Sequence, residues 1–271
     1  MDATISPTKL YLRLLRIAIH RRMQYRADFM TGIVGVVLMN VSVLTLISIL
    51  VSRFKDLGGW TMWQMVFLYC MWMMAHSIFG IFMRHTRTLE DYLIQGTFDQ
   101  FLMRPASAFV LLLGREVSYI GLGDMAFGVG GIVLSYRGLG LQWGVGLWAY
   151  FFVAIISGAI IEGCILLSIT CIAFWSGRSR RAEGLAGQVN NLVQYYPVRI
   201  FGAGFQVLVT GILPFAFLNY YPSMALLGKV DAANDPFWWL AYAGPVVAAI
   251  MLYITSRVWT YALDHYSSSG S

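Results

Sequence analysis

The sequence predicts an all-α polytopic membrane protein, and its composition and the length of its apolar windows carry that prediction. Hydrophobic residues make up 58% of the 271 residues and charged residues only 12%, against roughly 25% charged in a typical soluble domain. A soluble chain this apolar would leave much of its apolar surface in water. We therefore expect one transmembrane domain over 1–271, with no separate soluble domain.

Apolar windows long enough to cross a bilayer follow one another along the chain. A transmembrane helix needs about 20 consecutive apolar residues. Six windows meet this need, at 29–51, 60–83, 117–136, 143–175, 198–218 and 237–259. The first window follows a long basic segment without a small-residue cleavage pattern, so we expect a retained helix rather than a signal peptide.

Lysine and arginine are divided unevenly between the two sides that these windows define. Fifteen of the nineteen fall before the first window, in alternate loops and at the end of the chain, and four fall on the other side. Short basic loops stay in the cytoplasm. The prediction is a multi-pass protein of the inner (cytoplasmic) cell membrane with both termini cytoplasmic.

The segment 1–28 is predicted to form a cytoplasmic amphipathic helix. Ser6 is a candidate N-cap, and Pro7 suits the first helical position. Basic residues such as Arg13 and Arg16 recur at helical spacing opposite apolar ones, which favours a helix lying in the headgroup region. It could be a membrane anchor or a gating element.

Motifs for catalysis and for metal or nucleotide binding are missing from the sequence. The only Gly-Lys pair, Gly228 and Lys229, is followed by Val, and no HExxH is present. The three cysteines form no CxxC and are interpreted as apolar packing. We expect no enzyme activity, no cofactor or metal held by this chain, and no nucleic-acid partner.

Two carboxylates, Asp124 and Glu162, fall near the middles of the third and fourth windows. An Asp at the centre of a membrane helix costs roughly 2.5 kcal/mol or more, so such groups pair or line a polar cavity. They could form a proton relay or a cation site, or be protonated and bonded to a neighbouring helix. The glycines around Asp124 favour close helix approach; they are Gly121, Gly123, Gly128, Gly130 and Gly131.

The second window is rich in soft side chains. Met73 and Met74 lie there among aromatic residues, and such surfaces repack around varied apolar ligands. The window could line a pathway for amphiphiles or serve as packed core. A lone histidine in this window, His76, is expected to be packed and hydrogen-bonded rather than a ligand.

The segment 85–106 interrupts the apolar windows with acidic residues, among them Glu90, Asp91 and Asp99. Thr88 and Thr97 each begin a capping-box pattern, with an acidic or amide side chain three residues later. Gly96 and Pro105 are placed to end the two short helices that result. These helices could be an interfacial connector or a docking element for a soluble partner.

Three stretches resemble the short six-helix permeases of the ABC-2 superfamily, the membrane subunits of type-2 ABC exporters. They are "GTFDQFLMRPAS" after the second window, and "QYYPVRIF" and "LPFAFLNYYPSMALLGK" around the fifth. The resemblance implies that 85–106 seats in a groove of a separate ATPase subunit, which binds ATP and magnesium. The coupling residues would be Glu90, Asp91, Gly96, Thr97, Asp99, Arg104 and Pro105.

The resemblance also implies a non-cytoplasmic re-entrant segment, 219–236, that closes the exit between the fifth and sixth spans. Its gate residues would be Pro214, Tyr220, Tyr221 and Pro222, and the prolines fit a break in helical hydrogen bonding. The chain would pair with itself or with a second, similar permease. The path would run between the two, lined mainly by the first, second and fifth spans.

Together these features predict the permease subunit of an ATP-driven exporter of a hydrophobic or amphiphilic molecule. One alternative is a proton-coupled secondary transporter that uses Asp124 and Glu162. Another is a membrane-embedded enzyme acting on lipids, for which these two carboxylates and His76 are the only candidate acids or bases. No nucleophile or metal motif in the sequence favours the enzyme.

Overall fold

The computed structural model describes Tyr11, 26–54, 58–104, 106–115, Ser118, 120–233 and 235–266. Within these residues every regular element is helical and no strand occurs, which confirms the all-α prediction. Pro105 and nearly all of the predicted helix 1–28 lie outside the described residues, so those two predictions are not tested.

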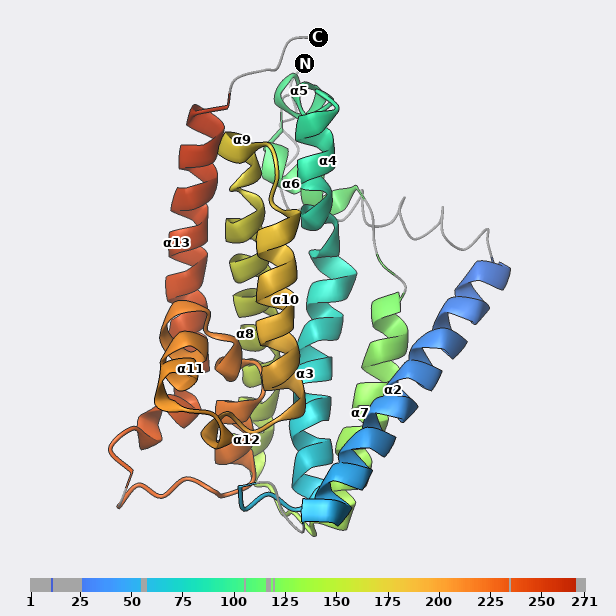
Figure 1. Ribbon diagram of the computed structural model, residues 1–271, viewed down its shortest axis with the longest axis vertical. Helices are drawn as coiled ribbons and strands as arrows, with labels where there is room; N and C mark the ends of the chain where they lie inside the picture. Colours follow the sequence, from blue (N-terminus) through green and yellow to red (C-terminus); the bar gives the residue numbers. More distant parts are fainter. Residues whose placement is uncertain are drawn as a thin grey trace.

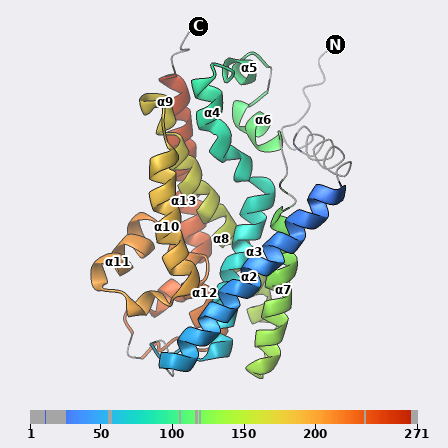
Figure 2. The ribbon, with the colours of Figure 1, turned by 45° about the vertical axis from the view of Figure 1, so that its right-hand side comes forward.

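Six longer helices run side by side along the long axis of the molecule (Figure 1). They are α2 (Arg26–Phe54), α3 (Met62–Phe82), α7 (Ile120–Gly138), α8 (Val145–Thr170), α10 (Arg180–Tyr195) and α13 (Gly244–Asp264). Helix α3 lies among the others, whereas α2 crosses α7 obliquely at the edge of the bundle (Figure 2). The buried core of the bundle follows α3, from Met65 to Phe79.

The described helices confirm a multi-pass membrane protein. Four are long and apolar enough to cross a bilayer: α2, α3, α8 continued through α9 (Ala173–Ser176), and α13. A bent pair, 203–212 with 215–226, brings the number to five if it counts as one span. The predicted number of six membrane spans therefore stays a prediction.

Short helices gather at one end of the bundle, which we call the α4–α6 end. They are η1 (Arg84–Thr88), α4 (Leu89–Ile94), α5 (Asp99–Leu102) and α6 (Ala108–Gly114), next to α9 and the end of α13 (Figure 1). A second apolar cluster holds them together, with Leu89, Phe98 and Leu112 fully buried against the α13 residue Trp259. The segment 85–106 is therefore a packed part of the fold.

Helices α3 and α7 are in close contact, as the glycines around Asp124 predict. A Cβ atom at Gly131 would lie 2.2 Å from Cys70 Sγ, and one at Gly121 would lie 2.9 Å from the carbonyl oxygen of Ser77. A side chain at Gly121 would displace the backbone of α3, and one at Gly131 would displace the Cys70 side chain. The close approach brings Asp124 beside the centre of the bundle.

The fifth window is where the sequence-based boundaries are wrong. Residues 198–218 do not form one helix but η2 (Val198–Ile200), α11 (Ala203–Val207), the π-helix η3 (Leu208–Ile212) and η4 (Phe215–Phe217). The chain then enters α12 (Tyr220–Leu226), after a bend of 76° between Ile212 and Phe215. The helix that runs along α3 and α8 is instead α10.

The apolar windows did not predict helix α10, because polar residues interrupt its apolar sequence. Its sequence, RRAEGLAGQVNNLVQY, is amphipathic rather than apolar all round. It also carries Arg199, which follows it, to the end opposite α4–α6, since Ile200 lies against Gly58. The predicted division of lysine and arginine then changes from fifteen and four to fourteen and five, which keeps its direction.

Candidate functional site

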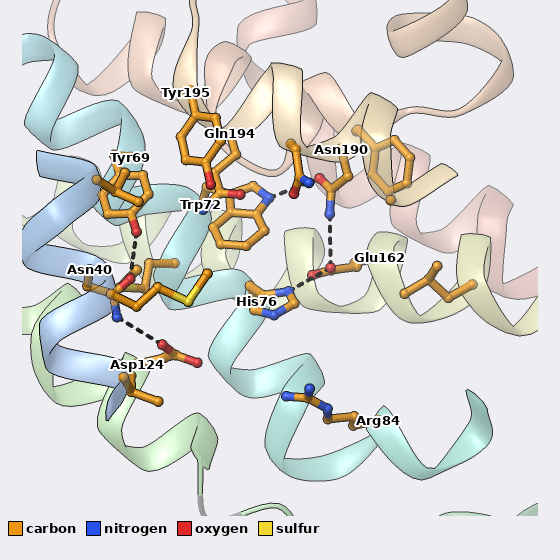
Figure 3. A pocket seen from close by; sticks show the side chains of 18 of the residues that line it. Asn40, Tyr69, Trp72, His76, Arg84, Asp124, Glu162, Asn190, Gln194 and Tyr195 are labelled. Atoms are coloured by element: carbon orange, nitrogen blue, oxygen red, sulfur yellow. Dashed lines mark hydrogen bonds and ion pairs between the residues drawn. The ribbon is translucent and has the colours of Figure 1, made fainter. Parts of the chain in front are cut away.

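A polar cavity of about 350 Å³ lies inside the bundle, between α2, α3, α7, α8 and α10 (Figure 3). Its wall includes the polar or aromatic side chains of Asn40, Tyr69, Trp72, His76, Asp124 and Glu162. Both carboxylates predicted at mid-membrane therefore reach the same space. They come from different helices, α7 and α8.

The first carboxylate, Asp124, ends a short chain of hydrogen bonds. The Tyr69 hydroxyl donates to Asn40 Oδ1 at 2.6 Å, and Asn40 Nδ2 donates to Asp124 Oδ1 at 3.1 Å. Asn40 is buried, and Asp124 is partly exposed within the cavity. Asn40 thus connects the Tyr69 hydroxyl of α3 to the Asp124 carboxylate of α7.

The second carboxylate, Glu162, ends a similar chain built on α10. Trp72 Nε1 donates to Asn190 Oδ1 at 2.9 Å, and Asn190 Nδ2 donates to Glu162 Oε1 at 3.1 Å. His76 Nδ1 lies 2.7 Å from the same oxygen. Glu162 is 1% exposed, yet its Oε2 has no hydrogen-bond partner among the described residues. A buried polar atom without a partner calls for an explanation.

The two ends of the cavity differ in character. Toward the α4–α6 end its wall contains Arg84, Arg87 and Glu183, with Arg87 Nε 3.2 Å from Glu183 Oε2. Toward the other end it contains Tyr195 and the fully buried Phe215 of η4. The broken segment that replaces the predicted fifth span therefore supplies part of the cavity wall.

The two methionines predicted for the pathway separate in the structure. Met73 lines the cavity, whereas Met74 packs toward Gly128, where an added Cβ would lie 3.2 Å from Met74 Sδ. Met74 therefore belongs to the contact between α3 and α7. His76 is packed and hydrogen-bonded, but it also faces the cavity.

Glu90 in the segment 85–106 holds the beginning of α10. Its Oε2 accepts hydrogen bonds from the backbone N–H groups of Ser179 and Arg180, at 2.5 and 2.8 Å, and from the Ser179 hydroxyl at 3.0 Å. The first N–H groups of a helix lack partners within it, so this carboxylate caps α10. Glu90 is 4% exposed.

These contacts also set the ionisation of Glu90. Burial alone would raise its pKa, but the hydrogen bonds from Ser179 and Arg180 and the charge of Arg180 outweigh burial. The pKa of Glu90 is therefore lowered from its usual value. The neighbouring Asp91 forms an ion pair with the Arg180 guanidinium, which is 63% exposed.

Two further contacts bind the α4–α6 end to α10. Glu183, in the first turn of α10, is buried, and its Oε1 lies 3.2 Å from the Thr170 hydroxyl of α8 and 2.9 Å from the Ser179 hydroxyl. Arg87 of η1 donates to its other oxygen. At the far end of α10, Asn219 Nδ2 donates to the carbonyl oxygen of Val193 at 2.9 Å.

Neither predicted capping box in 85–106 forms. Because η1 runs directly into α4, the Thr88 hydroxyl reaches back to the carbonyl oxygen of His85 at 2.7 Å. The Thr97 hydroxyl reaches back to Tyr92, and no side chain caps α5. Gly96, with φ +66°, ends the first helix as predicted.

The remaining predicted coupling residues are not brought together. Asp99 Oδ1 accepts from the Tyr266 hydroxyl at 2.9 Å, and Arg104 is exposed. Glu90 and Asp91 are about 90 residues from their partner Arg180 in sequence but contact it directly. Glu90, by contrast, is buried and bonds to the beginning of α10.

The predicted gate residues lie at the end opposite α4–α6. Pro214 stands at the 76° bend, as expected for a helix break. Pro222 does not interrupt hydrogen bonding, because it lies in the first turn of α12, where its missing N–H has no partner to lose. Tyr220 packs on Trp60, with ring centroids 6.0 Å apart, and Tyr221 bonds Thr210 at 3.0 Å.

Sequence reasoning missed the amide side chains of this site. Asn40, Asn190 and Asn219 connect α2, α10 and the segment after the bend to their neighbours. A signal was present for Asn40, since an Asn inside an apolar window tends to hydrogen-bond to a neighbouring helix. Asn190 and Glu183 were overlooked because α10 was read as a basic loop.

The described residues contain no group of three or more His, Cys, Asp or Glu side chains that could hold a metal ion. The fold and the cavity together define a multi-pass membrane protein with a polar space between its helices. Residues 37–270 match the family model for the ABC-2 family transporter protein, so the chain belongs to this family of transporter membrane components. The searches of curated proteins and of solved structures found no match.

Proposed function

We propose that this protein is the permease subunit of an ATP-driven exporter and works with a separate ATPase subunit that binds ATP and magnesium. Family membership supports the transporter class. The observation that carries the finer proposal is that one helix, α10, contacts the segment 85–106 through Glu90 and the cavity through Asn190. A movement of the segment 85–106 would therefore move α10, and α10 would in turn change the position of Asn190 in the cavity wall.

The exposed tip of the segment 85–106 supports its role as the docking element. Ile94, Leu102 and Met103 are 59%, 46% and 77% exposed, whereas their neighbours Leu93 and Phe101 are buried. Exposed apolar side chains on a tightly packed end of a molecule mark contact sites for other proteins. In this proposal they seat in a groove of the ATPase, with Arg104 beside them.

The orientation follows from this assignment. The α4–α6 end faces the cytoplasm, where the ATPase and its nucleotide are, and the bundle spans the inner membrane with both termini on the cytoplasmic side. Six spans result if α10 is the fifth. The bent segment 203–226 then lies toward the non-cytoplasmic face, where Phe215 and Tyr220 close the exit.

A second permease completes the path in this proposal. Most of helix α2 is not covered by the rest of the chain, and its outer face is apolar, with Leu38, Leu46 and Ile49 at least 50% exposed. Lipid or a second helix could cover that face. A homodimer or a heterodimer with a similar permease would place two such cavities on either side of the pathway, for a hydrophobic or amphiphilic substrate.

The proton-coupled transporter keeps one observation in its favour. Asp124 and Glu162 line the same cavity, and His76 of α3 lies 2.7 Å from Glu162 Oε1. That mechanism requires transport that survives ATP depletion and stops with an uncoupler. The ATP-driven mechanism requires transport that stops on ATP depletion and survives an uncoupler. Measuring transport in inverted vesicles under both conditions therefore distinguishes the two mechanisms.

Docking is tested with the double variant Ile94→Ala, Met103→Ala. The variant should insert and fold normally, because both side chains are exposed, but an ATPase subunit should no longer copurify from native membranes in mild detergent. The matched control is Ile250→Ala on α13, which is 52% exposed and far from the α4–α6 end. An ATPase that copurifies equally with all three proteins would count against this docking surface.

A further inference from the structure

We infer that the cavity is a binding site for an organic cation, held by Asp124 and Glu162 between aromatic walls. The inference rests on the proposed function, because it names the class of molecule that the exporter would carry. Its structural basis is the unused oxygen of Glu162 together with the direction of the hydrogen bonds around both carboxylates.

Two carboxylates line the cavity, each at the end of a chain of hydrogen bonds. Each chain, from Tyr69 through Asn40 and from Trp72 through Asn190, ends by donating to a carboxylate oxygen. Figure 3 shows the two carboxylates on different sides of the cavity, each at the end of its own chain. Neither chain supplies a positive charge.

Glu162 keeps one oxygen for a ligand. Its Oε1 takes the contacts from Asn190 and His76, while Oε2 is buried without a partner among the described residues. A buried carboxylate that is half satisfied is costly unless an ion or a donor completes it. Since Glu162 lines the cavity, a positive group inside the cavity lies next to this carboxylate.

Among the described residues, the basic groups at the cavity leave Asp124 without an ion pair, while His76 lies 2.7 Å from Glu162. Arg87 is engaged with Glu183 toward the α4–α6 end. Arg84 lies at the edge of the cavity, and no ion pair within the described part of the chain joins it to Asp124 or Glu162 (Figure 3). His76 balances at most one of the two carboxylates, and only when it is protonated.

The walls suit an organic cation better than a hydrated metal ion. Trp72, Tyr69, Tyr195 and Phe215 contribute aromatic side chains to the lining, with one face of Trp72 stacked on His76, and Met73 adds a polarisable thioether. Aromatic faces attract ammonium groups, more strongly where water is excluded. A cavity of about 350 Å³ is of the size that holds a small organic ligand.

The test uses two ions of nearly equal size and shape and opposite charge, tetraphenylphosphonium and tetraphenylborate. The full-length permease is placed in nanodiscs of zwitterionic lipid without an ATPase, and saturable binding is followed through tryptophan fluorescence and through radiolabelled ion. We expect saturable binding of the phosphonium only. Glu162→Gln and Asp124→Asn should each weaken it by about tenfold or more, as expected for loss of one partner of a buried charge pair.

Asp264→Asn provides the matched control, because it removes an exposed carboxylate outside the cavity. It should leave binding unchanged. Equal binding of both ions, or phosphonium binding that survives Glu162→Gln and Asp124→Asn, would overturn the inference. Arg84→Gln adds a second arm: tighter phosphonium binding in that variant would show that Arg84 competes with the ligand for the carboxylates.

Failure of the cation site and failure of the exporter give different results. If phosphonium does not bind but ATP-dependent export of uncharged amphiphiles is found in vesicles, the inference is wrong and the proposed function stands. If phosphonium binds at the carboxylates but ATP drives no transport, the proposed function is wrong and the site stands.

Discussion

Two buried glutamates in this protein show opposite ways of keeping a carboxylate inside a fold. Glu90 is enclosed at the α4–α6 end, and a single oxygen collects three hydrogen bonds from the first residues of α10. Glu162 is enclosed at mid-bundle, and one of its oxygens has no partner within the described residues. In Glu90 the other oxygen lies 3.9 Å from Arg180 Nε, so both oxygens have a partner within the fold, whereas Glu162 leaves capacity for a ligand or a proton.

The difference indicates how the two groups divide between structure and function. A capping carboxylate stabilises the helix it caps, since N–H groups and helix dipole both favour the negative charge. A half-satisfied buried carboxylate destabilises the fold, so its presence points to a functional role. We expect substitutions at Glu90 to affect folding first, and substitutions at Glu162 to affect transport first.

The largest effect is expected for Glu90→Lys. The change removes the cap of α10 and places a positive charge beside its first N–H groups and Arg180, so we expect a loss of roughly 3 kcal/mol or more in the free energy of unfolding. Thermal unfolding in detergent, followed by circular dichroism, measures it.

Charge reversal at Glu90 therefore tests the fold before it tests docking. The exposed residues Ile94 and Met103 are better probes of the ATPase contact. If Glu90→Lys left the melting temperature unchanged and removed only ATPase association, the carboxylate would be a docking group, and the comparison with Glu162 would fail.

Glu162→Gln should have the next largest effect, but in the opposite direction. The amide keeps the shape and the contact to Asn190 and removes an incompletely paired charge, so the melting temperature should stay the same or rise. Transport by the complex with its ATPase should fall. A variant that melts earlier and transports normally would assign Glu162 to structure.

The sequence was sufficient to predict the class of fold and where the carboxylates lie along the chain. Apolar windows set the positions of α2, α3, α8 and α13, because a helix in lipid must be apolar over its whole length. The glycines near Asp124 predicted the contact between α3 and α7 for a similarly local reason.

What the sequence could not provide was the partner of each polar group. The amphipathic α10 has its polar residues turned toward Glu162, Trp72 and Glu90, so it resembles a surface helix when read alone. The contacts of Glu90 with Ser179 and Arg180 join residues about 90 positions apart. No local pattern predicts such a cap, and the resemblance to the ABC-2 permeases implies only a docking role for Glu90, which stays a prediction.

A smaller effect is expected from pH at the same junction. Because the pKa of Glu90 is lowered in the folded protein, its contribution to stability is present at pH values above the usual pKa of a glutamate and is lost as the pH falls through its folded pKa. The melting temperature should therefore drop on acidification, and less so for Glu90→Gln than for the unchanged protein. Equal pH dependence in both proteins would show that other carboxylates cause the drop.

The smallest effect is expected for Asp91→Asn, one residue from Glu90. Its partner Arg180 is largely exposed, and exposed ion pairs contribute roughly 0–1 kcal/mol. The melting temperature should change little, and adding salt should remove most of the difference. Stimulation of the ATPase by the permease is the decisive second measurement. If Asp91→Asn lowers that stimulation while stability holds, Asp91 contacts the partner directly, and the two adjacent acids divide between docking and capping. If both measurements stay unchanged, docking rests on the exposed apolar tip alone.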